Sequence, residues 1–160
     1  MQSSQQKSLL DELIFLLRKG NAHVYFNDAV KNIPFEDLGK KPGNLPYSIW
    51  QITEHIRITQ KDILNFSGNK NYKELEWPAD YWPQTVAPEN KTAWENSIKQ
   101  INDELDEFIE LLQHTADIFK PFEYGTGQSM LREAMVIADH TSYHTGEIIV
   151  VRRLLGNWNK

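Results

Sequence analysis

The sequence has no cysteine among its 160 residues. Disulfide bonds, zinc–thiolate clusters, iron–sulfur centres and cysteine nucleophiles are therefore excluded. Any bound transition metal must be held by the side chains of His, Asp or Glu. Imidazole ligands suit zinc, nickel, iron, cobalt and copper alike, so the residue types alone leave the identity of a metal open.

Clusters of lysine and arginine are also missing, and the formal net charge of -5 is spread along the chain. Proteins that bind nucleic acids or anionic membranes rely on such basic clusters. We therefore expect no nucleic-acid partner and no membrane partner. A small-molecule substrate or another protein remains as the expected partner.

The sequence also lacks an apolar run of about 20 residues, the length that a membrane-spanning helix needs. Near the N-terminus, Asp11 and Glu12 stand beside an apolar run that is too short for a signal peptide. The expected compartment is the cytoplasm. No internal repeat, low-complexity tract or flexible linker divides residues 1–160, so we expect a single domain.

Apolar side chains that recur at spacings of three and four residues predict four long amphipathic helices. The first spans about residues 4–31, and the second begins after Pro46 and ends near residues 67–69. The third spans about residues 88–114 and the fourth about residues 128–155. Because no pair of strands is recognisable, the expected fold is all-α, a four-helix bundle.

Local signals support two of these boundaries and one loop. Ser48 and Gln51 fit an SxxQ capping box at the start of the second helix. Gly156 is a suitable residue to end the fourth helix. Between the second and third helices, Trp77-Pro78 and Trp82-Pro83 disfavour a continuous helix because proline lacks the N–H group. We expect an aromatic loop there that covers the core, with the wall of a substrate pocket as the alternative.

The fourth predicted helix carries two histidines four residues apart, His140 and His144. Residues at this spacing are neighbours on a helix, with roughly 5–6 Å between Cβ atoms, so both imidazoles can reach one ion at about 2.0–2.1 Å. The spacing selects one core-facing stripe: Glu133, Ile137, His140, His144, Glu147, Val151 and Leu154. It places three residues on the opposite face: Thr141, Thr145 and Arg152.

A histidine pair alone is equally compatible with two hydrogen-bonded or surface side chains. A third histidine, His55 in the second predicted helix, strengthens the metal interpretation. At about 100° per residue, it lies roughly 85° from the centre of the apolar stripe of its helix. It therefore flanks the core, a position that suits a ligand from a neighbouring helix.

Two segments resemble the DinB-like (DinB/YfiT) family of metal-binding helical bundles: PYSIWQITEHI at residues 46–56 and LREAMVIADHTSYHTGEIIVVRRLLG at residues 131–156. The resemblance covers nearly the whole chain. It implies a bundle of up-down-down-up topology, commonly a homodimer, that binds one divalent ion. His55, His140 and His144 match the ligands of that family.

The resemblance also implies a function, on which two hypotheses remain. Three neutral histidines leave the double charge of an ion intact and leave positions open, as in catalytic sites. The first hypothesis is a metal-dependent enzyme, a thiol-dependent transferase or a hydrolase, which acts on a small-molecule substrate such as a low-molecular-weight thiol. The second is a non-enzymatic metal-binding or stress-response protein with a structural ion. Zinc or nickel is the metal that we expect first.

Four further polar residues are candidates for supporting roles. Glu133 and Glu147 share the histidine stripe, so each is a candidate catalytic residue that hydrogen-bonds a ligand imidazole or acts as a general base; a rim salt bridge is the alternative. The family resembled often has glutamine in place of Glu147. His23 is expected on the core-facing side of the first helix, as a hydrogen-bonded core histidine or, as the alternative, near the metal. His114 is expected to be a stabilising cation at a helix C-terminus.

Overall fold

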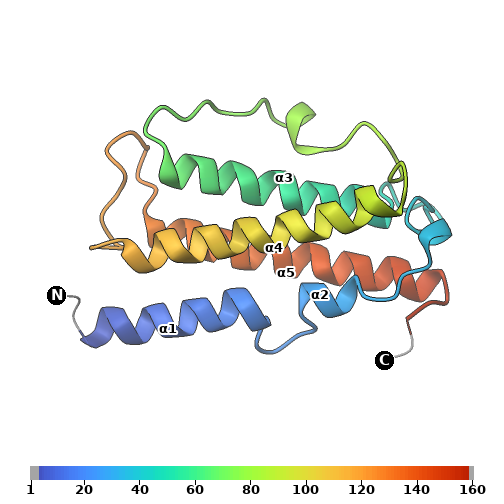
Figure 1. Ribbon diagram of the computed structural model, residues 1–160, viewed down its shortest axis with the longest axis horizontal. Coiled ribbons are helices and arrows are strands. Elements are labelled where there is room, and N and C mark those ends of the chain that lie inside the picture. The colour runs from blue at the N-terminus through green and yellow to red at the C-terminus, as the bar shows by residue number, and fades with distance from the viewer. Residues whose placement is uncertain (1–3, 159–160) are drawn as a thin grey trace.

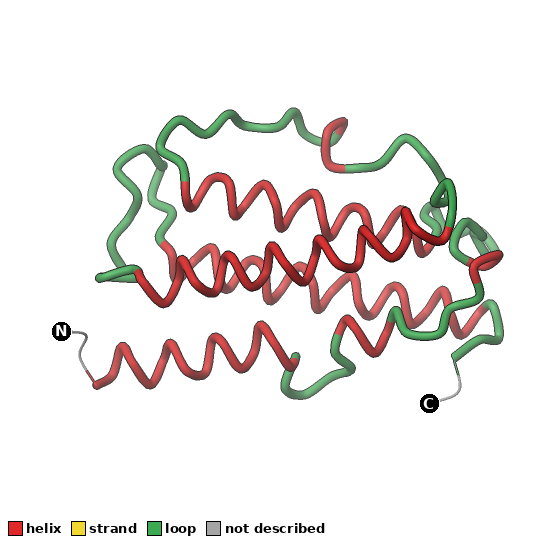
Figure 2. Tube along the Cα trace, viewed as in Figure 1, coloured by secondary structure: helices red, strands yellow, loops and turns green. Residues whose placement is uncertain are grey.

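The computed structural model describes residues 4–158 of the chain. Its long helices are α1 (Ser4–Lys19), α3 (Ile49–Gly68), α4 (Lys91–His114) and α5 (Met130–Leu154). A short helix, α2 (Phe26–Ala29), and two 3-10 turns, η1 (Phe35–Asp37) and η2 (Ala79–Tyr81), lie in the connections. Residues 4–158 contain no strand (Figure 2). The prediction of an all-α fold is therefore confirmed.

The long helices pack lengthwise against one another (Figure 1). Helix α3 contacts both α4 and α5, while α1 and α2 lie end to end along α5. The colours of Figure 1 show that α1 and α5 run in one direction and that α3 and α4 run in the other. The connection from α3 to α4 runs the length of α3 on the outside of the bundle.

Capping groups mark the starts of three helices. The Oγ atom of Ser48 accepts a hydrogen bond from the amide of Gln51, and the amide of Ser48 donates to Oε1 of Gln51, so the predicted capping box is present. The side chain of Asn90 accepts from the amide of Ala93 before α4. Ser129 caps α5 in the same way. Each cap satisfies an amide that would otherwise lack a partner in the first turn.

The first helix is shorter than predicted. It ends at Lys19 because Gly20 and Asn21 adopt positive φ angles, +66° and 50°, which a right-handed helix does not contain. The chain then turns and forms α2 from Phe26. The apolar periodicity continues across the break because α1 and α2 both pack against α5, and this continuity made residues 4–31 resemble one helix.

The environment of α5 also differs from the prediction. Thr145 and Arg152, expected on the face away from the core, are only 2% and 5% exposed, whereas Leu154 is 60% exposed. The reason is that α5 is covered by α3 on one side and by α1 and α2 on another. The guanidinium group of Arg152 donates hydrogen bonds to the carbonyl groups of Ala29 and Lys31, which offset the cost of its burial.

The apolar core forms two clusters along the bundle axis. Helix α3 contributes Ile63 to one cluster and Ile56 to the other. Helix α5 likewise contributes Ile137 to the first and Ile148 to the second. The stretch of α5 between Ile137 and Ile148 carries polar side chains, and this is where the candidate site lies.

Candidate metal centre

Three histidines from two helices gather at the contact between α3 and α5. One ring nitrogen each from His55, His140 and His144 lies within 4.8 Å of the other two. His55 and His144 are buried, and His140 is partly buried. In the part of the chain that the structure describes, no other group of three or more His, Asp or Glu side chains is close enough to share a metal ion.

The spacing of the nitrogens fits coordination of one ion. The Nε2 atoms of His55 and His140 are 3.0 Å apart. Two nitrogens at about 2.0–2.1 Å from a common ion are separated by about 3.3 Å in a tetrahedral site and about 2.9 Å at a right angle. The ring centroids of the three pairs are 4.4, 4.7 and 4.8 Å apart, with the rings edge to face. Donor type and spacing therefore both suit a divalent transition metal.

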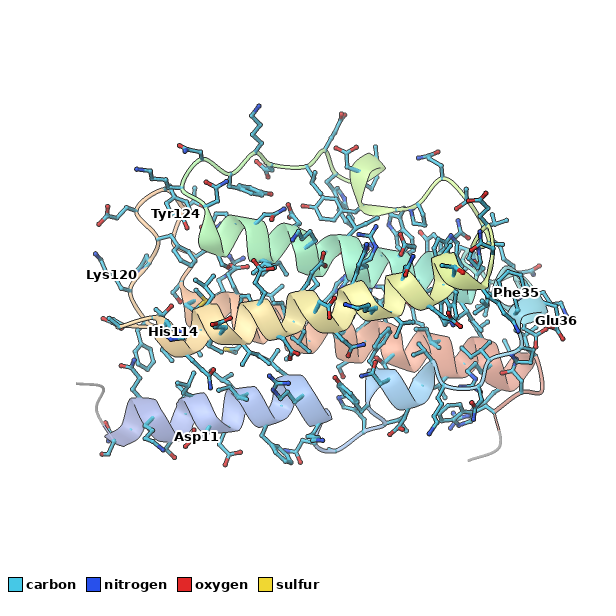
Figure 3. The ribbon with its side chains drawn as sticks, in the orientation of Figure 1. Asp11, Phe35, Glu36, His114, Lys120 and Tyr124 are labelled. Atoms are coloured by element: carbon cyan, nitrogen blue, oxygen red, sulfur yellow. The ribbon has the colours of Figure 1, made fainter. Side chains whose placement is uncertain are left out.

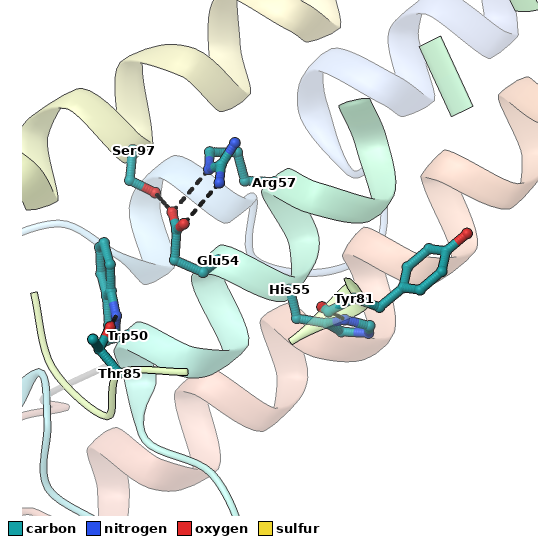
Figure 4. Close-up of polar contacts among 7 residues, drawn as sticks. All are labelled: Trp50, Glu54, His55, Arg57, Tyr81, Thr85 and Ser97. Atoms are coloured by element: carbon teal, nitrogen blue, oxygen red, sulfur yellow. Dashed lines mark hydrogen bonds and ion pairs between the residues drawn. The ribbon is translucent and has the colours of Figure 1, made fainter. Parts of the chain in front are cut away.

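The tautomer of His55 is fixed by the loop after α3. Its Nδ1 atom lies 2.7 Å from the backbone carbonyl oxygen of Tyr81, which can only accept, so Nδ1 donates. Figure 4 shows the carbonyl of Tyr81 beside the imidazole and the phenol ring pointing away from it. Nε2 of His55 consequently keeps its lone pair and faces the other histidines.

The ring of His144 is oriented by an acid one turn further along α5. Nδ1 of His144 lies 2.6 Å from Oε2 of Glu147. The carboxylate accepts a hydrogen bond from Nδ1–H, so Nε2 of His144 is left with its lone pair. A carboxylate behind a ligand imidazole fixes its orientation and raises its basicity. Of the two acids proposed from the sequence, Glu147 is therefore the one that hydrogen-bonds a histidine of the cluster.

Trp82 covers the cluster from the aromatic loop. Its indole ring stacks on the imidazole of His55 at a centroid distance of 3.9 Å and an interplanar angle of 4°. Tyr47 in turn stacks on Trp82 at 3.8 Å and 11°. Trp77, by contrast, is 69% exposed. The loop was expected chiefly to cover the core, with the wall of a substrate pocket as the alternative, and the direct contact of Trp82 with His55 was not predicted.

Burial favours the neutral form of two imidazoles of the cluster, those of His140 and His55. The pKa of His140 is lowered to about 3, chiefly by burial and then by the proximity of His144 and His55. The pKa of His55 is also lowered, again chiefly by burial, against the opposing effect of the hydrogen bond to Tyr81. Metal coordination requires neutral imidazole, so the environment favours the state that binds an ion.

The structure places the two remaining histidine candidates away from the cluster. His23 is exposed, with Nδ1 2.9 Å from the carbonyl of Val24 and Nε2 3.0 Å from Oγ of Ser142. The expectation that it faces the core was wrong, because α1 ends at Lys19 and His23 falls in the following turn. His114 is the exposed last residue of α4 (Figure 3), at the helix C-terminus where the sequence placed it.

Glu133 is buried but does not touch the histidines. It is 5% exposed, and its carboxylate lies 3.1 Å from the guanidinium of Arg132. It lines a cleft near the cluster together with Tyr81 of the aromatic loop and with Asp62, a residue that the sequence analysis did not single out. Asp62 follows His55 by seven residues, so its position on the same helical face was a signal that the spacing contained.

Fold and site together define an all-helical protein whose three-histidine cluster is compatible with binding a divalent metal. A family model described as DinB family matches residues 8–159. The chain therefore belongs to the DinB family. No curated protein and no solved structure gives a significant match. Among the helices of residues 4–158, none combines the length and apolar character that crossing a membrane requires.

Proposed function

We propose that this protein binds one divalent transition-metal ion through the Nε2 atoms of His55, His140 and His144 and is a metal-dependent enzyme. The observation that carries the proposal is the hydrogen bonding of two of these rings through Nδ1, to Tyr81 and Glu147, which directs their free nitrogens to one point. Such orientation behind the ligands is typical of metal sites.

Three neutral ligands define the chemistry of the site. An ion held in this way supplies a Lewis acid that lowers the pKa of a coordinated thiol or water. The chain itself orients two of the imidazoles, and Trp82 shields one face of His55 from water. The reaction class that we propose is thiol-dependent transfer or hydrolysis, with a low-molecular-weight thiol as substrate. Zinc or nickel is the preferred metal, and iron, cobalt and copper remain compatible with imidazole.

Three further features belong to the proposal. We propose the up-down-down-up topology, which the helix directions in Figure 1 support, and a homodimer, as the family resemblance implies. We also propose a cytoplasmic location, as the sequence indicates. The net charge of -5 supports a small-molecule partner in place of nucleic acid or membrane.

A structural ion is the second candidate, because the cluster joins α3 to α5. Against it stand the two apolar clusters, which bury side chains from α1, α3, α4 and α5 and do not include the histidines. We therefore expect the bundle to fold without an ion.

The test combines metal analysis with activity measurements. Protein purified without a histidine tag should contain one equivalent of metal. The loaded protein should transfer a small thiol, such as cysteine, to an electrophile such as monobromobimane faster than the His140→Ala variant does, or hydrolyse an aryl ester faster than that variant. Stoichiometric metal without a difference in either reaction would favour the structural role, and absence of metal binding would refute the site.

A further inference from the structure

An acidic cleft opens near the histidine cluster, between α3, the aromatic loop and the segment that leads into α5. Its volume is about 600 Å³, within the range of small-molecule sites. Its charged lining comprises three acids and one base: Asp62, Glu74, Glu133 and Arg132. The cleft therefore carries an excess of negative charge, and it takes no part in holding the metal.

Asp62 is held in place by two phenol groups. The hydroxyl of Tyr72 donates to one carboxylate oxygen and the hydroxyl of Tyr81 to the other, each at 2.7 Å. Burial, reinforced by Asp62, raises the pKa of Tyr72 to about 12 and also raises that of Tyr81, so both hydroxyls remain protonated donors at neutral pH. Each carboxylate oxygen has a second lone pair for another donor.

Glu133 brings a second negative charge to the cleft from α5. Its side chain is almost fully buried, and its partner Arg132 has a side chain that is 56% exposed. Burial raises the pKa of Glu133, and the charge of Asp62 adds to this effect. A positive group placed between Asp62 and Glu133 would offset the repulsion between the two carboxylates. It would also offset part of the cost of burying the carboxylate of Glu133.

Two elements connect the cleft to the histidines. Tyr81 binds Nδ1 of His55 through its carbonyl and Asp62 through its hydroxyl. On α5, Arg132 lines both the cleft and a shallow groove that contains His140. The groove is also lined by three apolar side chains and two polar ones: Leu131, Met135, Val136, Ser129 and Asp139.

The distance between the two sites follows from helix geometry. Seven residues separate His55 from Asp62 on α3, and seven separate Glu133 from His140 on α5. Seven residues correspond to about 10 Å along a helix at 1.5 Å per residue. Along both α3 and α5, the acidic residues of the cleft therefore lie about two helical turns from the histidines.

We infer that the substrate of the proposed metal site is an organic cation, whose ammonium or guanidinium group binds between Asp62 and Glu133 about 10 Å from the metal-binding atom. This inference rests on the proposed function. An aliphatic segment joins the two ends and packs along the groove beside Val136, which lies between Arg132 and His140 on the surface of α5. The acids of the cleft do not form a group that could share a metal ion, so an organic cation fits them better than an inorganic one.

The first experiment tests the cleft without involving the metal. Binding of 1,6-diaminohexane to the full chain is measured by nuclear magnetic resonance titration, with 1,6-hexanediol as the neutral probe of equal length. The diamine should shift signals of residues in the cleft, and the diol should not. Repeating the titration in His140→Ala removes coordination of the amine to a metal as an explanation.

Variants assign the binding to the two acids. Glu133→Gln and Asp62→Asn should each weaken diamine binding by about tenfold or more, because a charge-assisted hydrogen bond is lost. Glu123→Gln is the matched control, since the side chain of Glu123 is 86% exposed and lies outside the cleft. Circular dichroism establishes that each variant is folded. Equal affinity in all variants, or equal binding of diamine and diol, would overturn the inference.

The second experiment links the cleft to the metal site. With cobalt(II) bound, 8-aminooctane-1-thiol and 8-hydroxyoctane-1-thiol are compared by the thiolate-to-cobalt absorption band. The aminothiol should bind about tenfold more tightly, and Glu133→Gln should remove this advantage. Equal affinity of the two thiols would overturn the inference while leaving the proposed function intact. If neither thiol gives the band but the diamine occupies the cleft, the thiol function fails and the cation site stands.

Discussion

The carboxylate of Glu147 lies 2.6 Å from Nδ1 of His144, one turn away on the same helix. Because the acid accepts from this nitrogen, the other nitrogen of the ring points to His55 and His140. The relationship is local to α5, so it survives small movements between helices. His55 depends instead on a carbonyl from the loop, which reaches it only in the folded chain.

Removing a ligand histidine should reduce metal binding. His140→Ala or His144→Ala should abolish stoichiometric binding, and His55→Ala should weaken it strongly, because two ligands on one helix do not complete the site. Calorimetric titration and elemental analysis measure these changes, with His114→Ala as an unaffected control. Undiminished binding in the His55 variant would disprove a site shared between α3 and α5.

Two substitutions of Glu147 should separate the effect of its charge on metal affinity from the effect of its hydrogen bond. Glu147→Ala removes the acceptor behind His144 and should lower metal affinity by about 10–100-fold. Glu147→Gln keeps a neutral acceptor and should have a smaller effect. Competition titration with a chromogenic chelator measures both affinities. If the alanine variant binds as tightly as the wild type, the carboxylate does not orient the ligand.

The stability of the chelated protein should depend on pH through His140 and His55. Their folded pKa values are lowered, that of His140 to about 3, whereas the unfolded values are near 6.5. Between these limits the unfolded chain binds more protons, so stability is full above about pH 6.5 and falls as the pH drops towards the folded values. Each histidine contributes at most about 1.4 kcal/mol per pH unit in that window.

Urea unfolding of chelated protein between about pH 7 and pH 4.5 measures this slope. The free energy of unfolding of the His140→Gln variant should fall less steeply with decreasing pH than that of the wild type. The variant lacks the histidine whose pKa is lowered to about 3. Titrating carboxylates contribute equally to both proteins and cancel in the comparison. Identical slopes would show that His140 is not held neutral by burial.

Chelation should leave the bundle folded. The apolar clusters of α1, α3, α4 and α5 do not include the histidines, so far-ultraviolet circular dichroism should change little when the ion is removed. Bound metal should add about 2.7 kcal/mol at a free concentration one hundred times its dissociation constant. Loss of helical signal on chelation would identify the ion as structural.

The sequence by itself determined features that depend on interactions within one or two turns. The capping box of Ser48 and Gln51 was predictable because its partners are three residues apart. The pairing of His140 with His144 followed equally from the helical repeat, since residues four apart lie on one face. The all-α fold followed from the same periodicity over longer stretches.

Tertiary structure decided which surfaces those helices cover and what completes the site. The apolar periodicity continues across the break at Gly20 because α1 and α2 both pack against α5, so periodicity alone does not reveal the break. Thr145 is buried because α5 has neighbours on more than one side. The carbonyl of Tyr81 and the ring of Trp82 reach His55 from 26 and 27 residues further along the chain, where no local spacing rule links them. Such contacts form only after α3 has packed against α5, because this packing creates the surface that the aromatic loop contacts.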